Sequence, residues 1–167
     1  MARWAAAGIG AFMLLAANGE AAEFEHVRSE EASIRGLLRN GYERSTTFKA
    51  LVDEIESRPG IVYIAQAVAL SRGMHGALLH AVGGSREIPI FRVLLKTNLG
   101  REEAMAILAH ELQHVLEVLH AGSPADAAAM ARLFGALDHQ IEDSKFETED
   151  ARAIASRVLS ELRANRR

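Results

Sequence analysis

Residues 107–120 read ILAHELQHVLEVLH, and this stretch decides the fold class. Apolar residues such as Leu108 and Leu112 recur along it at helical spacing. His110 and His114 are four residues apart, so they lie only about 40° apart around an α-helix. The stretch therefore predicts a helix with one face fastened into a core and two imidazoles on another face.

Two imidazole nitrogens placed in this way can bind one tetrahedral zinc ion. Glu111 is offset by about 100° and points along the side of the same cleft, where a carboxylate can accept a proton from a water molecule that the metal activates. The chain has no cysteine, so His, Asp and Glu are the strong ligands that remain. Two histidines at this spacing can also be ordinary hydrogen-bonded side chains, but the uncharged interior and apolar flanks of the motif favour zinc.

The rest of the chain predicts one α+β domain built around this helix. In chain order, the expected elements are helices at 29–40 and 45–57, strands at 61–68, 75–82 and 88–97, and helices at 101–121, 125–137 and 148–163. The strands at 75–82 and 88–97 are expected to form a hairpin, joined at residues 83–85. The helix at 45–57 starts behind a Ser/Thr cap, and Thr148 is the expected cap of the last helix. Pro89 cannot donate to a strand ladder, so the start of its strand is expected at an edge or outside the sheet. The expected architecture is a small antiparallel sheet, then the HELQH helix, then two further helices.

The first 21 residues have the layout of a secretory signal peptide. Arg3 precedes an apolar run from Trp4 to Ala17, and small residues at Gly19 and Ala21 suit cleavage after Ala21. The apolar run is short for a segment that spans roughly 30 Å of hydrocarbon, so a retained membrane anchor is the less favoured alternative. We therefore expect an exported protein, periplasmic or secreted, whose single domain occupies residues 22–167.

The amino-acid composition limits the classes of binding partner that we expect. Hydrophobic residues make up 49% of the chain and charged residues 25%, as in globular proteins. The net charge is −3 and no Lys/Arg-rich run is present, so neither nucleic acid nor an anionic membrane is an expected partner.

His110, Glu111 and His114 match the HExxH motif of the zincin metallopeptidases, and the order of strands followed by helix resembles that fold. The small size is most similar to minimal members of the glutamate-ligand (gluzincin) branch. The resemblance implies a peptidase with a Zn²⁺ cofactor and Glu111 as general base. It also implies a cleft between a sheet and a helical part, where a peptide or protein substrate pairs along the edge strand.

A third zinc ligand has several candidates. Glu147 is the first, because the glutamate-ligand branch completes its site with an acid on a downstream helix. Glu117 lies on the correct face of the long helix, but about 10 Å along the axis from His110, so it can instead hold an imidazole in place. Glu149 is the third candidate. His120 has metzincin spacing, but that branch has glycine where this chain has Glu117.

Two other functions remain open at this point. The domain can be a non-enzymatic exported protein in which the metal or the helix is structural. It can also be a zinc amidase that acts on a cell-wall amide.

Overall fold

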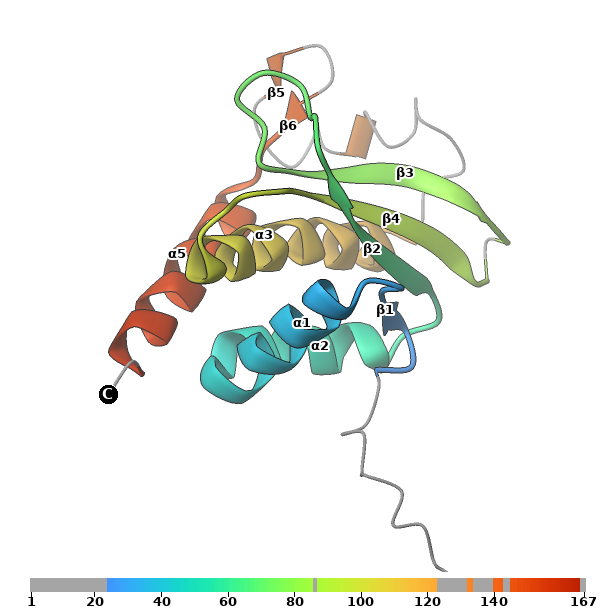
Figure 1. Ribbon diagram of the computed structural model, residues 1–167. Helices are drawn as coiled ribbons and strands as arrows, with labels where there is room; N and C mark the ends of the chain where they lie inside the picture. Colours follow the sequence, from blue (N-terminus) through green and yellow to red (C-terminus); the bar gives the residue numbers. More distant parts are fainter. Residues whose placement is uncertain (1–23, 86, 123–131, 134–139, 143–144, 166–167) are drawn as a thin grey trace, which may run out of the picture.

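A sheet packed on one side by helices forms the body of the protein (Figure 1). The computed structural model describes residues 24–85, 87–122, 132–133, 140–142 and 145–165. The elements in chain order are β1 (Val27–Arg28), α1 (Ala32–Arg44), α2 (Thr46–Glu56), β2 (Ile61–Ala67), β3 (Gly76–Gly84), β4 (Pro89–Lys96), α3 (Arg101–His120), β5 (Gln140–Glu142), β6 (Lys145–Phe146) and α5 (Glu149–Ala164). The predicted α+β class is confirmed.

The predicted antiparallel sheet is wrong in its topology, because the sheet is mixed. Its strand order is β1-β2-β4-β3, and β2 pairs in parallel with both β1 and β4. The hairpin of β3 and β4 is confirmed as antiparallel, but β4 is inserted between β2 and β3. β4 buries Phe91, Val93 and Leu95 on one face, and such an apolar strand is suited to an inner position.

The two edge strands of the sheet are β1 and β3, so the strand that contains Pro89 is an inner one. Pro89 opens β4 opposite Gly84, one residue before the pairing with β2 begins at Ile61 and Ile90. The proline therefore lies at the end of an inner strand, where its missing N–H interrupts little of the ladder. The strand β1 was not predicted, because two residues are too short for a periodic pattern.

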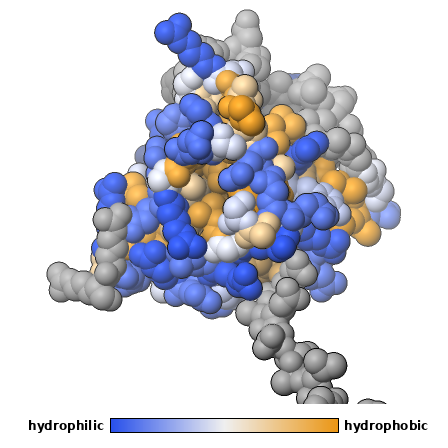
Figure 2. Space-filling view, viewed as in Figure 1, coloured by the Kyte–Doolittle hydropathy of each residue, from blue (hydrophilic) through white to orange (hydrophobic). Residues whose placement is uncertain are grey.

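The hydrophobic core lies between the inner face of the sheet and the helices. α3 packs against β3, β4 and α5, while α1 and α2 cover the remainder (Figure 1). Fully buried residues of α3 include Met105, Leu108, Leu112 and Val115. Charged and polar side chains cover most of the face seen in Figure 2, with apolar side chains visible between them.

Two predicted helix starts are confirmed by their capping bonds. The Ser45 side chain accepts a hydrogen bond from the Phe48 N–H at the start of α2, and the Thr148 side chain accepts one from the Ala151 N–H at the start of α5. Each bond satisfies a backbone donor that the helix itself leaves unpaired. The start of α5 is therefore tightly defined, which matters because Glu147 directly precedes its cap.

Some expectations fall outside the described residues. They are the signal peptide at 1–21 and the helix at 125–137 apart from Arg132 and Leu133. Among the helices of the described part, none has both the length and the apolar character needed to cross a membrane.

Glu161 of α5 joins that helix to the start of α2. Its carboxylate accepts hydrogen bonds from the Ser45 hydroxyl at 2.6 Å, from the Thr47 hydroxyl at 2.6 Å and from the Thr47 backbone N–H at 3.0 Å. Burial alone would raise the pKa of Glu161, but these hydrogen bonds outweigh burial and lower it. The charged form therefore stabilises the fold.

We expect Glu161→Gln to lower the free energy of unfolding by about 1–2 kcal/mol near neutral pH, because charge-assisted bonds are lost. A carboxyl whose pKa is lowered in the folded state contributes fully above its unfolded pKa, about 4.3, and loses this contribution as the pH falls further. Urea unfolding from pH 7 to pH 3 measures both effects. The difference between wild type and variant should shrink at acid pH, and Glu43→Gln, at an exposed position, should show neither effect.

Candidate metal centre

Helix α3 presents the HELQH residues from the middle of its length. Its other faces are anchored in the core, so the backbone positions of these residues are fixed. Glu111 and His114 are buried, at 7% and 5% exposure. The side chain of His110 is 18% exposed and borders a cavity. A rigid helix with one polar face at a cavity is a suitable frame for a site that needs fixed geometry.

The two imidazoles point their Nε2 atoms toward each other. These atoms are 3.1 Å apart, and the rings are nearly perpendicular, at 87°. Glu147 Oε1 lies 3.3 Å from His110 Nε2, so a carboxylate from the segment before α5 joins the pair. Ligand atoms of His110, His114 and Glu147 all lie within 4.8 Å of one another.

This donor set suits zinc. Two ligand atoms on a tetrahedral zinc ion are about 3.3 Å apart when each bond is about 2.0–2.1 Å. The Nε2–Nε2 and Nε2–Oε1 separations are close to that value. Two imidazoles and one carboxylate are also a known ligand set for catalytic zinc. The residues therefore fit a single zinc ion without rearrangement of the helices.

Glu117 contacts the other side of His114. Its Oε2 is 2.9 Å from His114 Nδ1, and its Oε1 accepts a hydrogen bond from the Thr148 hydroxyl at 2.8 Å. The carboxylate therefore holds the ring with Nε2 directed at His110, which is the arrangement that orients metal-binding histidines in many sites. As a ligand candidate Glu117 is placed apart from the three-residue group.

The Glu117 carboxylate also links the two helices that carry the group. Thr148 donates to Glu117 and caps α5, and Thr148 directly follows Glu147. Two hydrogen bonds, His114 to Glu117 and Glu117 to Thr148, therefore fix the position of Glu147 relative to His114.

Burial and, to a smaller extent, the nearby His114 lower the pKa of His110 to about 4, although a hydrogen bond to the backbone of Ala151 acts in the opposite direction. A ring with such a pKa is neutral at physiological pH. Neutral imidazole is the form that binds metals, so little proton release opposes binding at His110.

Glu111 lies beside the group but outside it. The pKa of Glu111 is raised to about 7, chiefly because the carboxyl group is buried and also because Glu147 is near; His114 and a hydrogen bond from the Leu78 backbone N–H offset part of this rise. A carboxyl group in this range exchanges protons readily near neutral pH. A cation bound at the group would favour the charged form, which accepts protons.

Gly76 of β3 lies close to the Glu111 side chain. A Cβ atom at Gly76 would lie 2.6 Å from Glu111 Oε1, 2.8 Å from its Cγ and 2.8 Å from Ile107 Cγ2. Only the absence of a side chain at Gly76 lets the strand approach α3 this closely. The role of Gly76 was not predicted from the sequence, although glycine within a strand often marks such a close approach.

The backbone of β3 next to the site faces the edge of the sheet with which no other described strand pairs. Residues of an antiparallel strand alternate between bonding to the neighbour and pointing away from it. The His75 carbonyl bonds to the Lys96 N–H of the β4 side, so the polar backbone groups of Gly76 and Leu78 point away from β4. This orientation agrees with the bond from Leu78 to Glu111.

The other two candidate ligands lie elsewhere. Glu149 is an exposed acid in the first turn of α5, and His120 Nε2 is 3.0 Å from Glu54 Oε1 near the end of α2. Neither belongs to the His110, His114 and Glu147 group. His120 ends α3, where a histidine can interact favourably with the helix dipole.

A cavity of about 650 Å³ opens directly beside the group. It is bordered by the start of β3, by α3 and by α5, and its lining includes His110, Glu111, His114 and Glu147. The candidate ligands therefore face a space large enough for part of a substrate.

In comparisons with known proteins, no family model, no curated protein and no solved structure matches this chain. The function of the site is therefore inferred from the geometry and chemistry of its own residues.

We expect the form that begins at Ala22 to bind one zinc ion, and His110→Ala or His114→Ala to abolish stoichiometric binding. Glu147→Gln should lose most of the affinity, because it removes a charged donor from the group. Glu117→Gln should weaken binding about 10–100-fold, as expected for a group that orients a ligand. Zinc affinity measured by competition with a chelating dye tests this order, and Glu149→Gln is the matched control. Equal losses in Glu147→Gln and Glu149→Gln would contradict the assignment of Glu147.

Proposed function

We propose that the protein is an exported zinc-dependent metallopeptidase that hydrolyses peptide bonds. The observation that carries this proposal is the meeting of His110, His114 and Glu147, whose ligand atoms all lie within 4.8 Å of one another, beside the buried carboxyl group of Glu111. Three protein donors at the wall of an open cavity favour a catalytic site over a purely structural one.

When bound, a zinc ion supplies Lewis acidity, which polarises a carbonyl group and makes water a better nucleophile at neutral pH. His110, His114 and Glu147 would hold it. Glu117 keeps the His114 ring in its orientation, and Ala151 does so for His110. These supporting bonds limit the motion of the donors, which is a requirement for efficient catalysis.

Glu111 is the general base in this proposal. It accepts a proton from the attacking water and then delivers it to the amine that leaves. Burial raises the pKa of this carboxyl group above its usual value, and a bound cation would favour the charged form that accepts the proton. Its burial excludes bulk water from around the proton that is transferred.

The edge of β3, which pairs with no second strand among the described residues, supports a peptide substrate in particular. Gly76 directs its backbone polar groups, and Leu78 its carbonyl, away from β4, toward the side on which an extended peptide can add as a further strand, while the Leu78 N–H bonds to Glu111. Pairing there would bring a peptide backbone alongside Glu111, which Gly76 contacts closely.

The decisive test is Glu111→Gln in the form that begins at Ala22. The amide preserves size and packing, so zinc binding and the fold should persist while hydrolysis falls by about 10²–10⁴-fold. A mixed peptide library with mass-spectrometric detection, with and without a chelator, measures the loss. Glu149→Gln should retain activity.

Other outcomes favour the alternatives. A zinc-loaded wild type that cleaves no peptide would favour the non-enzymatic domain. Cleavage of a cell-wall amide cross-link, with all library peptides left intact, would favour the amidase.

Gly76→Ala tests whether the position of Glu111 matters. The new methyl group would force Glu111 or Ile107 to move, because the nearest atoms lie at 2.6–2.8 Å. We expect kcat to fall by about 10²-fold, as misplacement of a catalytic group by about 1 Å can cause, with zinc content retained. Gly36→Ala is the control, since a Cβ atom there meets nothing within 4 Å. Full activity in Gly76→Ala would argue against Glu111 as the base.

A further inference from the structure

The cavity extends from the metal centre toward the start of α3. Its walls there are small or apolar, with Ala106 and Ile107 on α3 and Ala155 and Leu159 on α5. Such walls suit an aliphatic chain. The far part of the cavity differs, because it is bordered by His75 and Glu103.

Glu103 lies on the same face of α3 as His110. Seven residues separate them, which corresponds to roughly 10 Å along the helix axis. The Glu103 carboxylate is 3.7 Å from His75 Nδ1, and its side chain is 52% exposed. The Glu103 carboxylate therefore lies at the far end of this part of the cavity, which we call the passage. The passage begins at the candidate metal ligands and is walled by Ala106, Ile107, Ala155 and Leu159.

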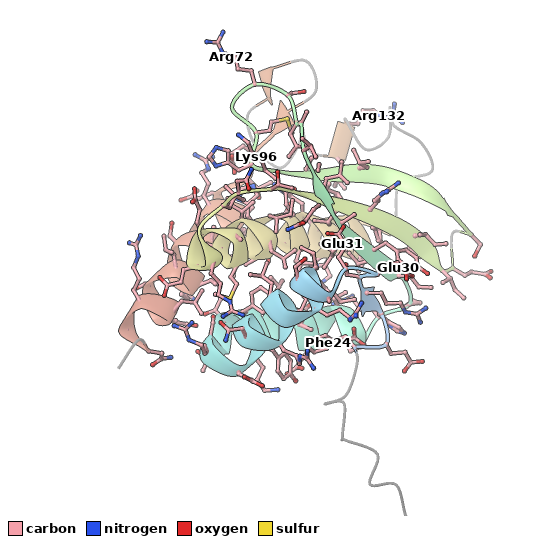
Figure 3. All side chains as sticks on the ribbon, in the orientation of Figure 1. Phe24, Glu30, Glu31, Arg72, Lys96 and Arg132 are labelled. Carbon is pink, nitrogen blue, oxygen red and sulfur yellow. The ribbon has the colours of Figure 1, made fainter. Side chains whose placement is uncertain are left out.

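Glu103 is the charged group at the far end of the cavity from the candidate metal ligands. Glu111 and Glu147 line the cavity at those ligands, where a zinc ion would offset their charge, and Arg152 Nε lies 3.8 Å from Glu147. No lysine or arginine is among the described lining residues, and Arg72, on the loop that leads into β3, points away from the body of the protein (Figure 3). A carboxylate at the end of a cavity attracts a cationic group.

We infer that this passage receives a long side chain with a cationic head, that of lysine or arginine, from the substrate residue that follows the cleaved bond. The aliphatic stem contacts Ile107 and Leu159, and the head pairs with Glu103. The inference rests on the proposed function.

The direction of the substrate follows from β3. A peptide that pairs antiparallel with β3, the slightly more stable arrangement, runs opposite to it. The part of the substrate after the cleaved bond then lies toward the start of β3, where His75 and Glu103 border the cavity. The new N-terminal residue of the product should therefore be the cationic one.

Peptides that differ only at that residue test the inference, with Lys, Arg, Met and Glu compared by kcat/KM. Met resembles Lys in length but has no charge. For the wild type we expect Lys and Arg to exceed Met by about fivefold, the upper end for a half-exposed ion pair, and Glu to be the poorest. The preference should shrink in high salt, because exposed charges are screened.

Glu103→Gln should bring the Lys-to-Met ratio close to one, and Glu103→Lys should raise the Glu peptide above the Lys peptide. Glu87→Gln, an exposed acid before β4, should leave the ratio as in the wild type. Equal cleavage of Lys and Met peptides by the wild type would overturn the inference while the peptidase stands. A ratio that persists in Glu103→Gln would overturn the role of Glu103. If zinc-loaded protein cleaves none of the peptides, both the inference and the proposed function fail.

Discussion

The packing of α3 between the sheet and α5 determines where every candidate functional group lies. Its apolar side chains are fully buried, so the helix cannot rotate without exposing them. The histidines and Glu111 are consequently held on the side that faces the cavity. Burial of apolar area supplies the stability, and the polar groups of the site depend on it for their geometry.

A second constraint joins α3 to α5. Thr148 caps α5, donates to Glu117, and stands next to Glu147, while Glu117 contacts His114. The candidate metal ligands therefore come from α3 and from the segment directly before α5, and hydrogen bonds join these two parts next to the ligands. This explains how a residue outside regular structure, Glu147, can have a defined distance from a residue in the middle of α3.

The sequence predicted the parts of the structure that depend on local rules. The HELQH helix, the caps Ser45 and Thr148 and the β3–β4 hairpin follow from periodicity and capping chemistry, and the structure confirms them. Strand order did not follow, because insertion of β4 between β2 and β3 depends on long-range packing. The contact of Gly76 with Glu111 also joins distant segments, so spacing alone does not reveal it. Helical spacing suggested Glu117 and the resemblance to the glutamate-ligand branch suggested Glu147, but only side-chain positions separate their roles.

The electrostatics of the site oppose the burial of its groups. Glu147 contributes to the raised pKa of Glu111, and His114 contributes to the lowered pKa of His110. Burying such groups costs free energy unless they share a compensating partner. A divalent cation held by His110, His114 and Glu147 would provide that partner, since it attracts both carboxylates and binds the imidazole lone pairs. Its binding free energy would then add to folding stability at the contact between α3 and α5, because the unfolded chain does not bring the donors together.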